Sequence, residues 1–328
     1  MKFLIAGLGS IGRRHLRNLR TLGEQDILLY RTHQATLPED DLAGLLVETD
    51  LRRALAQEPE AVIVANPTAL HLETAIAAAE AGCHILLEKP ISHSLEGVKR
   101  LEEAAQRSGS RILVGFQFRF HPTLRKAAEL LGAGALGRIL SVRAHWGEYL
   151  PNWHPWEDYK KSYAARGDLG GGVILTLCHP LDYLRMLLGE VQALWALTSA
   201  TNFGLAVEDT AEIGLRFNSG AIGSVHLDYN QQPGAHRLEI IGSDGTLAWD
   251  NATGLLRRYL PANKEWEDYP APAGFERNVM FVEEMRHFIQ VARGEADSLC
   301  TLADGKRALE LALAALCSAR ESKMIVLK

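Results

Sequence analysis

The sequence predicts an α/β protein of two domains: a parallel sheet covered by helices, then a second α/β domain built on a large, mostly antiparallel open sheet. Three observations support this prediction. Short apolar runs alternate with helical periodicity over the first third of the chain, turn signals recur at short spacing after Val191, and 328 residues suffice for two hydrophobic cores. We place the domains at residues 1–120 and 121–328, and the last helix is a candidate for packing back on the first domain.

The first domain is predicted from apolar runs of strand length separated by amphipathic segments. The apolar runs are typical of buried parallel strands and cover residues 2–6, 27–30, 61–65, 84–87 and 111–115. Helical periodicity covers residues 13–22, 70–81 and 95–108. This alternation gives βαβ units and a parallel sheet with helices on both faces.

The second domain begins where that alternation stops, after His121-Pro122. Its predicted elements are a helix over 123–131, a long strand over 138–149, a loop over 150–168, a helix from the glycines at 170–172 through 188, strands between 191 and 269, helices over 279–293 and 302–319, and a last strand over 324–327. Turn signals such as Asn218-Ser219-Gly220 separate the central strands, which therefore form a largely antiparallel sheet.

Composition excludes several functional classes. A net charge of −5 argues against a general nucleic-acid binder, which needs a basic face. No apolar run approaches the ~20 residues of a membrane span. The four cysteines are scattered without a Cys-x-x-Cys pair, which favours reduced thiols in the cytoplasm. His145, His154 and His179 lack metal-ligand spacing, so we expect no metal.

The motif Gly7-Leu8-Gly9-Ser10-Ile11-Gly12 directly follows the first strand and opens a helix. This context is that of the Rossmann dinucleotide-binding fingerprint. Gly7 makes the tight turn, Gly9 admits the pyrophosphate, and Gly12 lets helix and strand pack closely. Ser10 and Ile11 begin the helix, whose free N–H groups and partial positive charge attract phosphate. The alternative is a glycine-rich turn without a ligand.

The second strand ends in Tyr30-Arg31-Thr32, with no carboxylate where an NAD site carries the residue that binds the adenosine ribose. A guanidinium at this position suits a 2′-phosphate. Arg31, helped by Thr32, therefore favours NADP(H), with NAD(H) also possible. The alternative is a solvated arginine beside an NAD site.

Polar residues follow the next two strands. Asn66 is a candidate contact to the cofactor's ribose or nicotinamide, and His71 is either a cofactor contact or merely the first residue of a helix. Glu88-Lys89-Pro90 ends the fourth strand. There Lys89 can hydrogen-bond a substrate hydroxyl and lower its pKa, while Glu88 can hold the nicotinamide ribose. The alternative for Lys89 is a surface lysine at a strand end.

Taken together, the glycine motif, Asn66-Pro67 with His71, Glu88-Lys89-Pro90 and the segment 170–182 resemble the glucose–fructose oxidoreductase/inositol dehydrogenase family, Gfo/Idh/MocA. The resemblance covers essentially the whole chain. It implies hydride transfer between nicotinamide and a hydroxyl-bearing carbon of a sugar, cyclitol or nucleotide-sugar. It also implies a second domain whose open sheet often forms an oligomer interface, and hence a homodimer or homotetramer.

The resemblance further assigns catalytic roles. The family's catalytic lysine corresponds to Lys89, and its helix histidine corresponds to His179, which would act as the general base. Thr176 occupies the place of the family's aspartate, and a hydroxyl cannot neutralise an imidazolium. Because Asp182 lies three residues after His179, it shares a helix face with it. Either His179 works with Lys89 alone, or Asp182 takes over part of the aspartate's role.

Substrate-side candidates follow the fifth strand and the long loop. The family commonly has an amide and an arginine where Gln117 and Arg119 stand, which makes Gln117 a candidate cofactor contact near the nicotinamide and Arg119 a candidate substrate contact. The alternative is that Arg119 ties the two domains together. Trp153 and Tyr163 suit sugar rings, and Arg166 suits a carboxylate or phosphate. The alternative for this loop is a lid that packs on itself or on a neighbouring subunit.

The leading hypothesis is an NADP(H)- or NAD(H)-dependent dehydrogenase or reductase that acts on a sugar-like alcohol or ketone. A second hypothesis is a glycosidase that oxidises and re-reduces its sugar with a bound NAD, a reaction known in this family. A third is a cofactor-bound sensor or partner protein with weakened catalysis, and Thr176 is the one feature that favours it.

Overall fold

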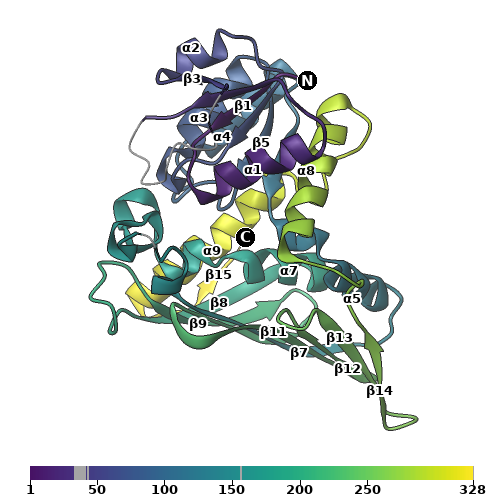
Figure 1. The fold of residues 1–328 in the computed structure, drawn as a ribbon. Coiled ribbons are helices and arrows are strands. Elements are labelled where there is room, and N and C mark those ends of the chain that lie inside the picture. Colours follow the sequence, from purple (N-terminus) through teal and green to yellow (C-terminus); the bar gives the residue numbers. More distant parts are fainter. Residues whose placement is uncertain (33–41, 43, 156, 328) are drawn as a thin grey trace. The chain divides into compact units, whose positions relative to one another are not determined.

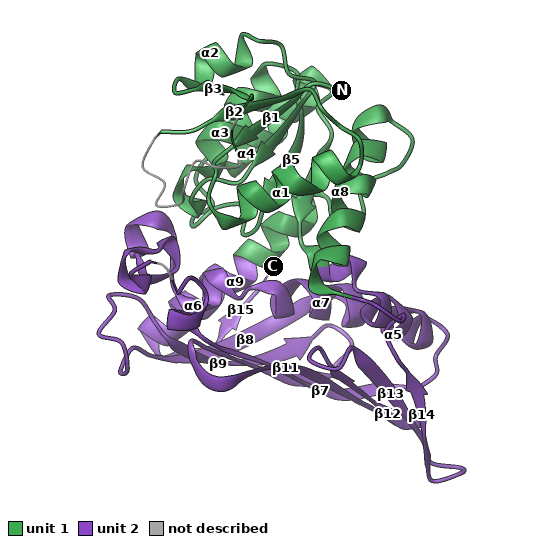
Figure 2. Ribbon diagram, viewed as in Figure 1, with its two compact units in different colours: residues 1–117, 276–309 green, residues 118–275, 310–328 purple. Residues whose placement is uncertain are grey.

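A computed structural model describes residues 1–32, 42, 44–155 and 157–327. The chain divides into two compact units (Figure 2): residues 1–117 with 276–309, and residues 118–275 with 310–328. The first junction lies close to the predicted boundary at residue 120. Residues 276–309, however, belong to the first unit, whereas the sequence analysis gave them to the second domain. The reason is helix α8 (Arg277–Arg293), which packs on α1 and on strands of the first sheet.

The first unit contains a six-stranded parallel sheet of order β3-β2-β1-β4-β5-β6, which confirms the predicted parallel sheet (Figure 1). Its strands are β1 (Phe3–Ala6), β2 (Ile27–Tyr30), β3 (Leu46–Glu48), β4 (Ala61–Val64), β5 (His84–Glu88) and β6 (Ile112–Gly115). Sequence analysis missed β3, because three residues are too few to show a pattern. The central strands β1 and β4 are buried along their whole length.

Apart from a five-residue helix that the sequence analysis missed, the helices of the first unit begin and end within three residues of the predicted bounds. They are α1 (Ser10–Thr21), α2 (Leu51–Leu55), α3 (His71–Glu80), α4 (Val98–Ser108), α8 and the first part of α9 (Leu302–Glu321). Helix α4 starts three residues later than predicted, since Gly97 before it has a φ of +86°, outside the helical region. No helix in the described part of the chain has the length and apolar character that a membrane span requires.

The second unit is built on a nine-stranded sheet of order β14-β13-β12-β11-β7-β10-β9-β8-β15. All neighbouring strands are antiparallel except β7 and β10, which confirms the predicted mostly antiparallel sheet. The strands are β7 (Ile139–Tyr149), β8 (Val191–Ser199), β9 (Thr210–Phe217), β10 (Ile222–Asp228), β11 (Asn230–Gly242), β12 (Gly245–Asp250), β13 (Leu255–Leu260), β14 (Glu265–Tyr269) and β15 (Ile325–Val326).

One face of this sheet carries the core of the second unit. On β7, Val142, Ala144 and Trp146 are buried and alternate with more exposed residues. The helices α5 (Pro122–Gly132), α6 (Val173–Thr176) and α7 (His179–Leu188) belong to this unit, together with the end of α9. The other face of the sheet carries no helix of this unit (Figure 1).

The predicted single helix from the glycines through residue 188 is two helices, α6 and α7. Pro180 lies in the first turn of α7 and has no N–H to donate to the carbonyl of Thr176. The helix therefore ends at Thr176 and restarts at His179. As a result, Thr176 and His179 do not belong to one continuous helix.

Candidate active site

The loop between β1 and α1 is shaped for close approach of a ligand. Gly7 has a φ of +99°, and a Cβ on it would lie 2.5 Å from the backbone nitrogen of Asn66. A Cβ on Gly12 would lie 2.0 Å from the Gly7 carbonyl oxygen. Among the residues that the structure describes, by contrast, none has an atom within 4 Å of a Cβ added to Gly9, and none caps the start of α1 with its side chain. The first N–H groups of α1, beginning at the exposed Ser10, thus fit a pyrophosphate.

The end of β2 carries the residues that the sequence analysis linked to the adenosine side. The Arg31 side chain is only 6% exposed, while Thr32 is exposed. The Arg31 N–H donates to the carbonyl oxygen of Glu48 on β3 (3.0 Å). This burial does not match the alternative of a solvated arginine.

His71 connects the turn after β4 to the turn after β5. Its Nδ1 lies 2.8 Å from the Pro90 carbonyl oxygen, and its Nε2 lies 2.8 Å from the Asn66 carbonyl oxygen. Burial lowers the pKa of His71, against the opposing effect of these two hydrogen bonds. Because each ring nitrogen lies within hydrogen-bond distance of a main-chain carbonyl oxygen, the geometry makes His71 a residue that positions the two turns. Direct contact with a cofactor, as the sequence analysis considered, would require one of these bonds to break.

Asn66 itself is held by the start of α3. Its amide Nδ2 donates to the Thr74 hydroxyl (2.9 Å). Its Oδ1 is buried and has no hydrogen-bond partner among the residues that the structure describes. Gln117, in the short turn after β6, is also buried.

Glu88 lies at the end of β5, and hydrogen bonds from two groups hold its carboxylate in place. The His15 Nε2, from α1, lies 2.6 Å from Glu88 Oε1, and Glu88 Oε2 accepts from the Lys89 N–H at 3.3 Å. A Cβ on Gly115 would lie 3.2 Å from this carboxylate, so β6 leaves it little room. Burial alone would raise the pKa of Glu88, but the His15 hydrogen bond and nearby positive charge keep it below its usual value.

A second buried carboxyl group adjoins this pair. Glu284, on α8, is fully buried, and neither of its oxygens has a hydrogen-bond partner in the described part of the chain. One imidazole nitrogen of His15 and one carboxyl oxygen each of Glu88 and Glu284 all lie within 4.8 Å of one another. Burial, reinforced by the negative charge of Glu88, raises the pKa of Glu284 well above its usual value. We infer that Glu284 carries a proton at neutral pH while Glu88 is ionised.

Sequence reasoning missed both His15 and Glu284. His15 lies three residues after Gly12 on the first helix, and Glu284 lies 196 positions after Glu88 (284 − 88) in a helix of mixed composition. No spacing rule joins residues on three separate elements. The only usable signal is the presence of polar residues on helix faces that otherwise bury apolar ones.

In the second unit, His179 is the first residue of α7 and is 2% exposed. Its ring centroid lies 5.0 Å from that of Phe118 and 5.3 Å from that of Trp146. Thr176, at the end of α6, is equally buried and lies beside Tyr229, whose hydroxyl donates to the Ala164 carbonyl oxygen at 3.3 Å. Burial raises the pKa of Tyr229 well above its usual value, so its phenol is protonated.

Asp182 and Arg119 form a bidentate ion pair. The Arg119 Nε donates to Asp182 Oδ2 at 2.9 Å, and its Nη2 donates to Oδ1 at 2.6 Å. The carboxylate is 1% exposed. Asp182 is therefore engaged by a guanidinium on both oxygens, which leaves it poorly suited to replace the family's aspartate beside His179. The pair lies within the second unit, so this contact of Arg119 does not tie two units together.

The glycine segment before α6 is held by Glu208. The Ile174 N–H donates to Glu208 Oε1 (3.1 Å), and the Val173 N–H donates to the Glu208 carbonyl oxygen (3.0 Å). Gly172 has a φ of +105°, and a Cβ on it would lie 2.5 Å from Glu208 Oε1. Glu208 thus caps the helix that ends at Thr176. Sequence analysis missed it, because one acidic residue between two strands carries no signal.

The described residues of the loop between β7 and α6 include four short 3₁₀ turns. Trp153 packs edge-on against Tyr229, with ring centroids 5.5 Å apart, and Trp153 and Tyr163 line a small pocket. Arg166 is exposed and paired with Asp168, with Arg166 Nε 3.0 Å from Asp168 Oδ1. Arg166 must exchange this partner to meet a substrate anion.

Comparison with protein-family models agrees with the fold and with the glycine loop between β1 and α1. A model described as an oxidoreductase family with an NAD-binding Rossmann fold matches residues 1–116. The model of the GFO/IDH/MocA C-terminal domain matches residues 124–248. Since the two models together cover most of the chain, it belongs to the GFO/IDH/MocA family of NAD(P)-dependent oxidoreductases.

Individual relatives are sugar and cyclitol dehydrogenases. The chain is 28% identical to a myo-inositol 2-dehydrogenase from Thermotoga maritima, over 100% of this chain and 99% of the relative. It is 32% identical to a levoglucosan dehydrogenase from Pseudarthrobacter phenanthrenivorans, over 60% of this chain and 57% of the relative. A solved levoglucosan dehydrogenase in complex with NADH and levoglucosan has a TM-score of 0.87 at 22% identity, over 99% of each chain, which shows a shared fold.

If Glu284 is protonated in the folded protein, the Glu284→Gln variant should be more stable to unfolding than the parent protein, by an amount that depends on pH. A buried carboxyl with a raised pKa makes the folded state lose stability as pH rises from about 4, where the unfolded chain ionises, towards the raised value. Because glutamine cannot ionise, the variant should not lose this stability, and its advantage in stability over the parent protein should grow as the pH rises through that range. We expect nearly equal melting temperatures near pH 4 and a melting temperature ~2–4 °C higher for the variant near pH 8.

Thermal unfolding monitored by circular dichroism at several pH values measures this difference. Glu283→Gln, on the exposed side of the same helix, is the matched control, and its difference from the parent protein should not grow with pH. A Glu284→Gln curve that runs parallel to the parent's at every pH would show that Glu284 is already ionised in the folded protein.

Proposed function

We propose that this protein is a dehydrogenase or reductase that transfers a hydride between a nicotinamide and a secondary alcohol or ketone of a sugar, cyclitol or nucleotide-sugar. The observation that carries the proposal is the ionised, buried Glu88 that accepts a hydrogen bond from the backbone of Lys89 at the carboxyl end of β5. Ligands bind at the carboxyl ends of the strands in open parallel sheets. Lys89 directly follows this fixed carboxylate, at the edge of the sheet where a substrate would bind.

The glycine loop and the turns beside it fit a nicotinamide dinucleotide. The open space over Gly9 and the uncapped start of α1 suit the pyrophosphate, and the unpartnered Oδ1 of Asn66 suits a ribose hydroxyl or the carboxamide. The bound nicotinamide supplies the hydride acceptor or donor. Everything else in the reaction falls to side chains of this chain.

We assign the proton chemistry to Lys89 and His179. In the oxidation direction, Lys89 donates a hydrogen bond to the reacting oxygen and stabilises the charge that develops on it. His179 accepts the hydroxyl proton, for which an imidazole has a suitable pKa range. Thr176 and Tyr229, both uncharged, support the helix junction beside His179. In the reduction direction, the same groups return the proton to the carbonyl oxygen.

The substrate class rests on the relatives and on the loop between β7 and α6. The two relatives described above, a myo-inositol 2-dehydrogenase and a levoglucosan dehydrogenase, both act on rings that carry several hydroxyl groups. The aromatic faces of Trp153 and Tyr163 suit the apolar faces of such rings. We therefore propose a cyclic polyol or sugar as the substrate, with Arg166 as the candidate contact for an anionic substituent.

Activity assays on a panel of cyclitols and sugars, with NAD⁺ and NADP⁺, test the proposal. Lys89→Ala and His179→Ala should each lower kcat/KM on the accepted substrate by roughly 10²–10⁴-fold, the usual contribution of acid–base catalysis. Lys99→Ala, which removes only an exposed ion pair with Glu103, is the matched control and should leave kcat/KM unchanged. Full activity in both Lys89→Ala and His179→Ala would refute the assignment.

We also propose that Arg31 makes NADP(H) the preferred cofactor, by pairing with the 2′-phosphate. Hydrogen bonds to a charged group are worth ~1.5–3 kcal/mol, which corresponds to roughly 10- to 100-fold in Kd. Fluorescence titration should therefore show tighter binding of NADPH than of NADH, and Arg31→Ala should remove the difference mainly by weakening NADPH. Tighter NADH binding that Arg31→Ala leaves unaltered would contradict the proposal.

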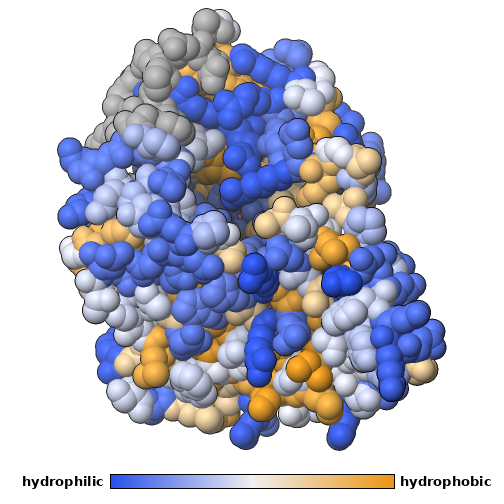
Figure 3. Space-filling view, turned by 60° about the horizontal axis from the view of Figure 1, so that its bottom comes forward, coloured by the Kyte–Doolittle hydropathy of each residue, from blue (hydrophilic) through white to orange (hydrophobic). Residues whose placement is uncertain are grey.

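We further propose a homo-oligomer in the cytoplasm. The helix-free face and edge of the second sheet expose large apolar side chains, namely Leu140, Trp195, Leu197, Ile222 and Val326. Patches of hydrophobic residues are also visible on the face drawn in Figure 3. Light scattering should give a multiple of the 36.1 kDa chain mass. The four free cysteines agree with a reducing compartment.

A further inference from the structure

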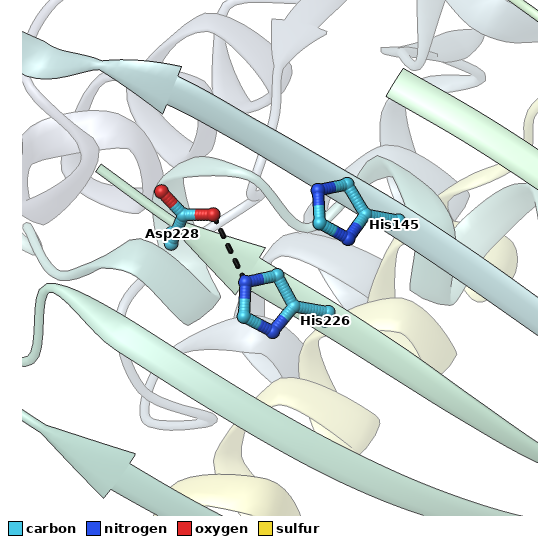
Figure 4. Close-up of side chains that lie close together, drawn as sticks. All are labelled: His145, His226 and Asp228. Atoms are coloured by element: carbon cyan, nitrogen blue, oxygen red, sulfur yellow. Dashed lines mark hydrogen bonds and ion pairs between the residues drawn. The ribbon is translucent and has the colours of Figure 1, made fainter. Parts of the chain in front are cut away.

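A cluster of imidazole and carboxylate groups lies on the helix-free face of the second sheet. Strands β7 and β10 run parallel, and their register pairs His145 with His226 and Gly147 with Asp228. Because side chains alternate along a strand, His145 and His226 point away from the buried Trp146 and Leu227. Figure 4 shows the two imidazoles side by side, with the Asp228 carboxylate directed at the ring of His226.

The donor atoms are close enough to share one ion. His226 Nε2 lies 2.9 Å from Asp228 Oδ2, and the two imidazole rings are nearly parallel, 12° apart with centroids at 4.7 Å. One ligand atom from each of His145, His226 and Asp228 lies within 4.8 Å of the others. Ligands of one zinc ion, each at about 2.0–2.2 Å from the metal, are themselves about 3–4 Å apart. Small side-chain rotations therefore suffice.

A fourth oxygen converges on the same point. Gln231, in the irregular segment of β11 between Asn230 and Ala235, places its Oε1 2.5 Å from His145 Nε2. A Cβ built on Gly147 would lie 2.3 Å from Gln231 Oε1 and also 2.3 Å from Asp228 Oδ2. The two oxygens thus meet over a glycine, and any larger residue at 147 would occupy the space between them.

The surroundings of His226 match those of a metal ligand. Its Nδ1 is hydrogen-bonded to Glu212 Oε1 on β9, while its Nε2 faces Asp228. Histidine ligands usually donate their second N–H to a carboxylate, which orients the ring and raises its basicity. Asp228 also accepts from the Asn230 N–H (2.7 Å), which fixes the carboxylate. Two imidazoles, one carboxylate and one amide oxygen form a donor set that zinc accepts.

We propose that His145, His226, Asp228 and Gln231 bind one divalent transition-metal ion, with zinc as the best match. All four ligands come from one chain, so the site needs no partner subunit. The ion would join β7, β10 and β11, which is a structural role separate from hydride transfer. The sequence analysis expected no metal, because these histidines lie 81 positions apart (226 − 145) and become neighbours only through the strand register.

Metal titration of the full-length, tag-free protein tests the site after treatment with a chelator and dialysis. Zinc binding is measured by calorimetry, and cobalt binding by the visible absorption bands of four-coordinate Co²⁺. We expect one ion per chain, a higher melting temperature with zinc, and at least tenfold weaker binding in His145→Gln and His226→Gln. His93→Gln, which removes an exposed histidine of the first unit, should bind like the parent protein.

Gly147→Ala provides a second test that leaves every ligand in place. Its methyl group would fill the space where the two oxygens meet, so zinc and cobalt binding should be lost while the metal-free protein still unfolds cooperatively. Binding of neither ion to the parent protein would overturn the proposal and leave a hydrogen-bonded network only. Undiminished binding in His145→Gln, His226→Gln or Gly147→Ala would place the ion elsewhere and overturn it equally.

Discussion

The hydrogen bond between His15 and Glu88 is the interaction on which the first unit's candidate chemistry depends. A carboxylate at 6% exposure is costly unless donors hold it, and His15 and the Lys89 N–H supply them. Burial, together with the negative charge of Glu88, then raises the pKa of the neighbouring Glu284 well above its usual value. The result is one fixed charge beside Lys89, set by residues on α1, β5 and α8.

His71 adds a second constraint to the same region. By bridging the carbonyl oxygens of Asn66 and Pro90, it fixes the turn after β4 relative to the turn after β5. Those turns carry the candidate cofactor contact and the candidate catalytic lysine. The His71 imidazole therefore holds the backbone at Asn66 and next to Lys89 in place without touching a ligand. A positioning role of this kind accounts for a histidine at this position without a catalytic function.

The sequence predicted the parallel sheet, the large mostly antiparallel sheet and the glycine loop, because each leaves a periodic or local pattern. It did not predict the helix break at Pro180, although the proline was visible, because the apolar residues on either side continue one helical pattern. It also could not find Glu208, Glu284 or the Arg119–Asp182 pair. Those contacts join residues that are distant in sequence, and only packing decides which polar groups meet.

Thr176 shows how such packing bears on the departure from the family pattern. A carboxylate at 2% exposure would need its own donors, whereas an uncharged threonine hydroxyl beside the Tyr229 phenol costs far less to bury. Asp182 does not restore the missing charge, since Arg119 engages both of its oxygens. Thr176 therefore leaves the chain without a carboxylate at the position where the family pattern has its aspartate.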